Sequence, residues 1–173
     1  LWIFPGAFIN ILFGADYLAG ENALRILSLG VLVISIFVIS NRLIAMAGNS
    51  KILFRDIFLI SVINLLLNWP LIKLYGLIGA AIATTISFII LSILFGFRSY
   101  KLLKIVPLRR KMVNIAFAGI ISAAALSYLK LFIETETIIP LTILGSFFLI
   151  LYILLLFLLG AFDKTDFMIA KSF

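Results

Sequence analysis

Long apolar segments follow one another along most of this chain, and each is close in length to a membrane-spanning helix. Hydrophobic residues make up 65% of the 173 residues and charged residues only 12%, whereas a soluble domain is about half apolar. A helix needs about 20 predominantly apolar residues to cross the hydrocarbon layer of a bilayer. The sequence therefore predicts an all-α, polytopic transmembrane helical bundle.

Polar breaks divide the chain into one partial span and five complete spans. Residues 1–13 are too short to cross a bilayer, so we expect them to end a helix whose beginning is missing from this fragment. The complete spans are expected at residues 23–47, 52–72, 76–97, 112–131 and 139–160. Residues 1–97 thus form one group of helices, a basic loop occupies 98–111, two terminal helices fill 112–160, and 161–173 form a tail.

Positive charge is distributed unevenly among these breaks. The loop at 98–111 holds six cations and no anion, which places it in the cytoplasm by the positive-inside rule. Only three of the fourteen cations then lie outside, namely Arg25, Lys73 and Lys130. This assignment predicts a multi-pass protein of the plasma membrane with a cytoplasmic carboxy terminus. We do not expect nucleic-acid binding, because the basic residues lie between apolar helices.

The residue types needed for most catalysis are missing. The sequence contains no Cys and no His, which excludes disulfides, thiol nucleophiles and imidazole or thiolate metal ligands. It also lacks a nucleotide-binding loop and a paired-carboxylate motif. We therefore expect no catalytic residues, no metal and no cofactor, and we do not expect an enzyme.

Small residues recur at a spacing of four in the span at 76–97. This spacing places small side chains on one helix face and lets two helix backbones approach closely in lipid. We expect the following residues to serve helix packing: Gly76, Gly79, Ala80, Ala83 and Thr84.

A few polar residues interrupt the apolar runs. Arg42 lies inside the first complete span, where a charge costs about 2.5 to 3.5 kcal/mol, so it either serves function or extends to the interface. Asn64 and Asn68 share one helix face; they either bind a ligand or hydrogen-bond between helices near Pro70. Asp56 is expected to pair with Arg55 or Arg42.

The span pair around these residues resembles the carboxy-terminal half of polysaccharide flippases, in the superfamily that also contains multidrug/toxin extruders and lipid II flippases. The resemblance covers about residues 12–97, and one departure is Lys73, where the family often has Pro. The matching residues are Leu12-Phe13-Gly14, Tyr17, Asn64, Asn68, Leu71-Ile72, Tyr75-Gly76, Gly79-Ala80-Ala81 and Ala83-Thr84.

This resemblance implies the second lobe of a two-lobe flippase that moves a polyprenyl-diphosphate-linked oligosaccharide by alternating access. The implied partners are that lipid-linked oligosaccharide, membrane lipid and the missing amino-terminal lobe of the same protein. Arg42 is then the candidate contact for the diphosphate, and Asn64 and Asn68 are candidate contacts for sugars.

Three alternatives stay open. A multidrug/toxin antiporter shares the architecture of the superfamily. A membrane glycan polymerase or glycosyltransferase would need a large outer loop with carboxylates, whereas the outer loops expected here are short. A small structural membrane protein of five spans is the third alternative.

Overall fold

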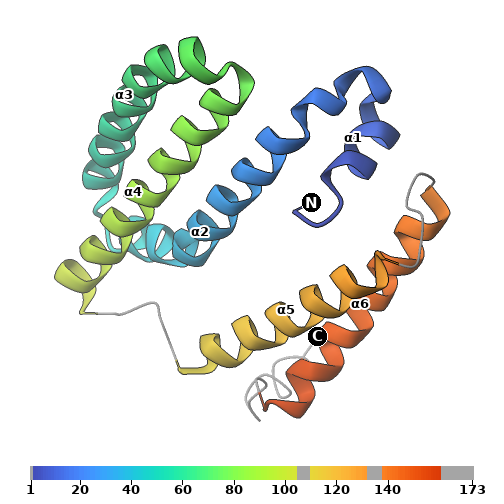
Figure 1. Ribbon diagram of the computed structural model, residues 1–173. Coiled ribbons are helices and arrows are strands. Elements are labelled where there is room, and N and C mark those ends of the chain that lie inside the picture. Colours follow the sequence, from blue (N-terminus) through green and yellow to red (C-terminus); the bar gives the residue numbers. More distant parts are fainter. Residues whose placement is uncertain (1, 105–109, 132–137, 161–173) are drawn as a thin grey trace. The chain divides into compact units, whose positions relative to one another are not determined.

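The computed structural model describes residues 2–104, 110–131 and 138–160, and within these ranges the chain is all-helical. It divides into two compact units, Leu1–Pro107 and Leu108–Phe173, whose helices are labelled in Figure 1. Four described segments are long and apolar enough to cross a membrane: Ala15–Met46, Ser50–Tyr75, Leu77–Leu103 and Ile139–Leu158. The expected all-α polytopic fold is confirmed.

The first unit begins with two short elements. Helix α1 (Pro5–Phe13) has nine residues, and Pro5 is tolerated there because the first turn of a helix leaves its N–H groups unbonded anyway. The 3₁₀ helix η1 (Ala15–Gly20) then leads directly into α2 (Glu21–Met46). We expected a loop between the partial span and the first complete one, so helical structure extends further than the polar residues suggested.

Helices α3 (Ser50–Tyr75) and α4 (Leu77–Leu103) form an antiparallel hairpin. Gly76 joins them with φ +58°, a left-handed conformation that glycine adopts more readily than other residues. Helix α4 continues six residues beyond the expected end at 97. The first part of the expected basic loop is therefore helical, while 105–109 lie outside the described residues.

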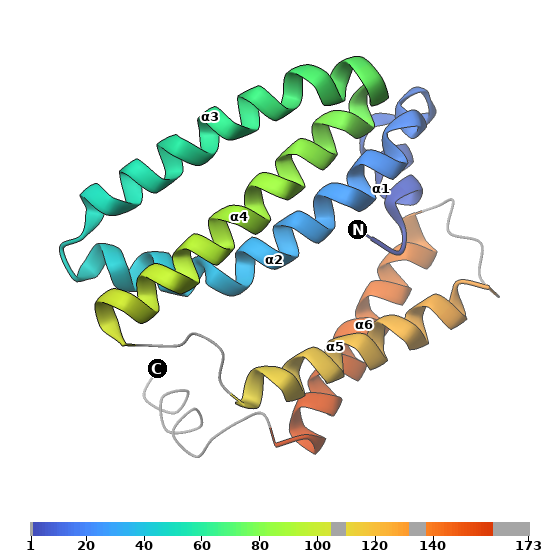
Figure 2. The same ribbon diagram turned by 60° about the vertical axis from the view of Figure 1, so that its left-hand side comes forward.

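Helix α4 is the central helix of the first unit. It lies between α2 and α3 in both views (Figures 1 and 2), and its contacts with those two helices are the most extensive in the unit. On the α3 side, a Cβ atom built on Gly79 would overlap the carbonyl group of Leu71. Ala83, one turn further on, is fully buried. The backbones of α3 and α4 are therefore in direct contact near the turn.

The contact between α4 and α2 also uses small side chains. The Thr85 hydroxyl donates to the carbonyl oxygen of Ile26 at 3.0 Å. A Cβ on Gly30 would lie 3.0 Å from the Thr85 Cα, and one on Gly96 would lie 2.9 Å from the Phe37 ring. Two faces of α4 thus allow close approach, one toward each neighbouring helix.

The small residues expected to serve packing do not all do so. Ala80 is half-buried, and Thr84 donates from its hydroxyl to the Ala80 carbonyl oxygen within α4. Gly76 is exposed, and a Cβ there would meet nothing within 4 Å. The packing prediction is therefore wrong for Gly76, which forms the turn; the Gly79 and Ala83 positions face α3.

The second unit is a pair of helices, α5 (Arg110–Leu129) and α6 (Ile138–Leu158), that pack on each other. The side-chain amide of Asn114 donates to the Leu159 carbonyl oxygen at 3.0 Å. The apolar part of α5, Val113–Leu129, is shorter than the span expected at 112–131. The expected tail, 161–173, lies outside the described residues.

Substitution of Gly79 tests the backbone contact. Because the new methyl group would overlap the Leu71 carbonyl, we expect Gly79→Ala to lower the free energy of unfolding by about 1–3 kcal/mol, the usual range for overpacking. Unfolding is followed by SDS titration in mixed micelles. Gly145→Ala is the matched control, because nothing lies within 4 Å of its Cβ position in α6. Equal stability of the two variants would contradict the contact.

Candidate functional site

Arg42 lies on α2, four residues before the helix ends at Met46. Its side chain is exposed, and among the described residues it has no ion pair or hydrogen bond. One helical turn corresponds to about 5.4 Å along the axis, so the guanidinium can reach the end of the helix. Arg42 is thus a charged group in a membrane span without a protein partner, whose five N–H donors are available to an anion.

Asn64 and Asn68 belong to a chain of hydrogen bonds that links α3 to α4. The Asn68 amide donates to Asn64 Oδ1 at 3.0 Å, and the Asn64 amide donates to Ser87 Oγ at 3.1 Å. The Ser87 hydroxyl then donates to the Ala83 carbonyl oxygen at 2.8 Å. Asn64 therefore makes an interhelical hydrogen bond, the structural alternative considered for it, and only the Asn68 carbonyl group is left over.

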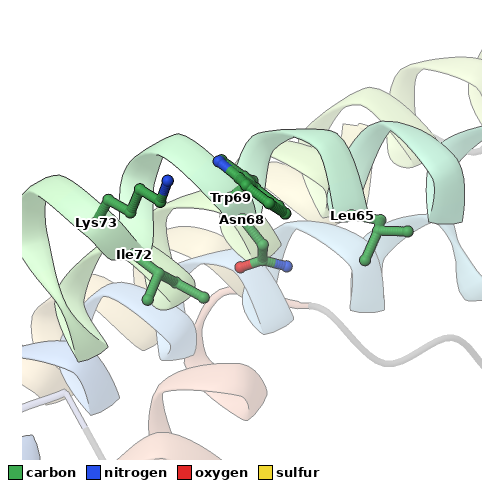
Figure 3. Close-up of a pocket in the computed structure, with 5 residues that line it drawn as sticks. All are labelled: Leu65, Asn68, Trp69, Ile72 and Lys73. Atoms are coloured by element: carbon green, nitrogen blue, oxygen red, sulfur yellow. The ribbon is translucent and has the colours of Figure 1, made fainter.

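The left-over acceptor borders a groove on α3. Asn68 Oδ1 is buried and has no hydrogen-bond donor in the described part of the chain, a state that costs about 1–3 kcal/mol. The groove has a volume of about 360 Å³, which is within the range of small-ligand sites. Figure 3 shows its lining residues: Leu65, Asn68, Trp69, Ile72 and Lys73.

Trp69 and Lys73 form one wall of this groove. The Lys73 ammonium lies 4.6 Å from the centroid of the Trp69 ring, a cation–π distance. Both residues come from the last two turns of α3, one turn apart, so helical spacing alone brings them together. The Trp69 side chain is nevertheless 71% exposed. The groove thus presents an aromatic surface, a cation and a hydrogen-bond acceptor to its surroundings (Figure 3).

A buried ion pair links α3 and α4 at the opposite end of the hairpin. The Arg98 guanidinium donates from Nε to Asp56 Oδ2 at 2.8 Å and from a terminal nitrogen to Oδ1 at 3.1 Å. Asp56 is only 5% exposed. We expected Asp56 to pair with Arg55 or Arg42; instead, Arg55 approaches only to 3.7 Å and is largely exposed. The expected pairing is corrected because adjacent residues on a helix point in different directions.

The sequence reading missed three groups that the structure brings together. Arg98 was assigned to a loop, because nothing in the basic run indicated that α4 extends past it. Ser87 was treated only as a small residue, although its hydroxyl completes the amide chain. Trp69 and Lys73 were treated as residues of the outer interface and outer loop, although their spacing of four was a signal for contact. Among the described residues, no group of His, Cys, Asp and Glu is arranged to hold a metal ion.

Substitution of the ion pair tests its contribution to stability. We expect Asp56→Leu to lower the free energy of unfolding by about 3–5 kcal/mol, because it leaves the Arg98 charge without its partner. Adding Arg98→Met should restore most of this loss. Glu21→Gln is the control, since the Glu21–Arg25 pair is half-exposed within α2 and worth about 0.3–0.5 kcal/mol. SDS titration measures all four proteins, and a double variant no better than Asp56→Leu would contradict the pairing.

Comparison with known proteins supports the membrane assignment. The chain is similar to an uncharacterized membrane protein of Methanocaldococcus jannaschii, with 31% identity over 154 residues. The aligned region covers 89% of this chain and 30% of that relative, so the chain spans less than a third of the relative's length. No family model and no solved structure matches the chain. Together with its long apolar helices, this similarity identifies the chain as a multi-pass integral membrane protein.

Proposed function

We propose that this chain is part of a flippase that moves a polyprenyl-diphosphate-linked oligosaccharide across the plasma membrane during polysaccharide biosynthesis. The observation that carries the proposal is Arg42, an unpaired cation in a membrane-spanning helix. A charge at such a place is costly unless it meets an anion or reaches the interface. A diphosphate is an anion whose oxygens match the planar, two-pronged donor arrangement of arginine.

The other deeply placed cation of the first unit is not available for this role. Arg98 already donates two hydrogen bonds to Asp56, and separating them would leave a buried carboxylate uncompensated. Arg42 has no such commitment. The contrast favours Arg42 as the diphosphate contact over the more buried arginine.

The charge distribution supports the orientation that this role requires. One end of the first unit carries Arg42, Lys51, Arg55, Arg98, Lys101 and Lys104. Its one described acidic residue, Asp56, is neutralised by Arg98. The other end carries Asp16 and Glu21 beside Arg25 and Lys73. By the positive-inside rule the first end is cytoplasmic, which is the side where a lipid-linked precursor would be collected. The same rule gives a cytoplasmic carboxy terminus.

The resemblance of residues 12–97 to polysaccharide flippases supplies the substrate class in this proposal. Its motif residues fall on the α3–α4 hairpin, where polar groups and close backbone contact coincide. In the proposed assembly, an amino-terminal lobe of the same protein completes the transport cavity. We propose movement of lipid and glycan without an enzymatic step.

Deletion of the gene tests the proposed transport. We expect cells without the full-length protein to lose surface glycan and to retain the lipid-diphosphate-linked oligosaccharide on the cytoplasmic leaflet. Surface labelling of glycan and extraction of the lipid-linked intermediate measure the two quantities. Unchanged glycan together with new sensitivity to cationic drugs would instead identify a multidrug/toxin antiporter.

Substitution of Arg42 tests the diphosphate contact in the complemented strain. We expect Arg42→Gln to reduce the rate of surface-glycan appearance by about tenfold or more, because a bidentate charged hydrogen bond is lost. Arg42→Lys should give an intermediate rate, since lysine keeps the charge but not the planar donor pair. Lys51→Gln is the matched control, an exposed cation in the first turn of α3 at the same end. If Arg42→Gln behaves like Lys51→Gln, Arg42 only extends to the interface.

A further inference from the structure

We propose that the groove on α3 binds a sugar residue of a lipid-anchored glycan, with a sugar hydroxyl donating to Asn68 Oδ1 and the sugar ring packing against Trp69. The proposal deepens the proposed function and rests on it for the substrate class. It is carried by the groove itself, whose residues belong to a different end of α3 from the Asp56–Arg98 pair.

The direction of the hydrogen-bond chain determines what the groove can accept. The Ser87 hydroxyl donates to a backbone carbonyl, so Ser87 Oγ accepts from the Asn64 amide. Asn64 Oδ1 is then the acceptor for the Asn68 amide. Each step fixes the next, and the last group, Asn68 Oδ1, is an acceptor without a donor. A ligand in this groove must therefore supply an O–H or N–H group.

Trp69 and Lys73 narrow the class of ligand further. An exposed indole offers a broad surface whose negative face attracts the weakly positive C–H groups of a sugar ring. The Lys73 ammonium over the same ring adds a donor for a sugar oxygen or for a phosphate attached to the sugar. Hydroxyl donors, a C–H face and acceptor oxygens occur together in carbohydrates.

The remaining lining residues indicate that the sugar is attached to a lipid. Leu65 and Ile72 are 72% and 47% exposed, and the whole groove lies on a candidate membrane span. A free sugar would lose water at this depth without a compensating apolar contact. A prenyl-linked sugar brings its own apolar chain, which can lie along these two side chains while Lys73, in the last turn of the helix, reaches the headgroup level.

Binding of two matched probes tests the groove. The full-length protein, reconstituted in phosphatidylcholine nanodiscs, is titrated with citronellyl diphosphate carrying one N-acetylhexosamine, and with citronellyl diphosphate alone. Isothermal titration calorimetry gives both dissociation constants. We expect the sugar-bearing probe to bind about tenfold more tightly, roughly the effect of one hydrogen bond to a buried acceptor plus ring contact. Asn68→Leu should abolish this preference.

Three further variants separate the roles of the lining residues. Lys73→Gln should weaken binding of both probes, whereas Lys51→Gln, a cation in the first turn of the same helix, should change neither. Trp69→Leu should reduce the sugar preference severalfold without touching the hydrogen-bond chain. Ser61→Ala is the control for Asn68→Leu, because the Ser61 hydroxyl only bonds within α3. Asn68→Asp keeps the acceptor oxygens, and it should retain the preference if Asn68→Leu does not fold.

The result separates this inference from the proposed transport. Equal affinity of the two probes for the unsubstituted protein would overturn the sugar site, even if deletion of the gene stops glycan export. A sugar preference that depends on Asn68 would support the site, even if the deletion strain keeps its surface glycan. A preference that survives both Asn68→Leu and Trp69→Leu would place the sugar elsewhere and overturn the inference.

Discussion

The close contact of α4 with both of its neighbours is the interaction on which the first unit depends. In lipid there is little hydrophobic drive for helices to associate, because lipid tails are as apolar as leucine side chains. Association then rests on van der Waals contact and on hydrogen bonds between helices. Gly79 supplies the first by bringing the α4 backbone onto the Leu71 carbonyl, and Thr85 supplies the second by bonding Ile26 on α2.

Polar side chains hold α3 and α4 together at two further levels. The Asp56–Arg98 pair lies toward the end of the hairpin away from Gly76, and the Asn64–Ser87 bond lies between that pair and the turn. Each of these groups would be expensive to leave unsatisfied in a membrane. Three kinds of contact at three depths therefore oppose sliding or separation of the two helices. In an alternating-access protein such a hairpin would move as one body.

The fold was largely predictable from the sequence, because the length and composition of apolar segments determine which of them form long helices in a membrane. The extent of α4 was not, because Arg98 and Lys101 resemble loop residues until the buried Asp56 is known to face Arg98. The shortness of the apolar part of α5 also departs from the expected span.

Individual side-chain roles were less predictable than the helices. Spacing correctly placed Asn64 and Asn68 within reach of each other, yet it does not reveal which residue on another helix completes a hydrogen-bond chain. The partner Ser87 lies 23 residues from Asn64, and its alignment depends on the position of the turn at Gly76. The same turn explains the error at Gly76, whose four-residue spacing continues the small-residue row although its backbone is no longer helical.

Arg42 and Arg98 illustrate why burial alone does not identify a binding residue in a membrane protein. Arg98 is the more buried of the two, and by depth it would be the stronger functional candidate. Its donors, however, already face a buried carboxylate, so a ligand anion would have to displace Asp56 and leave that charge uncompensated. Arg42 is exposed, and an approaching anion displaces only water or lipid headgroups. The group with unused hydrogen-bonding capacity is therefore the better candidate, and the same reasoning selects Asn68 over Asn64 at the other end of the unit.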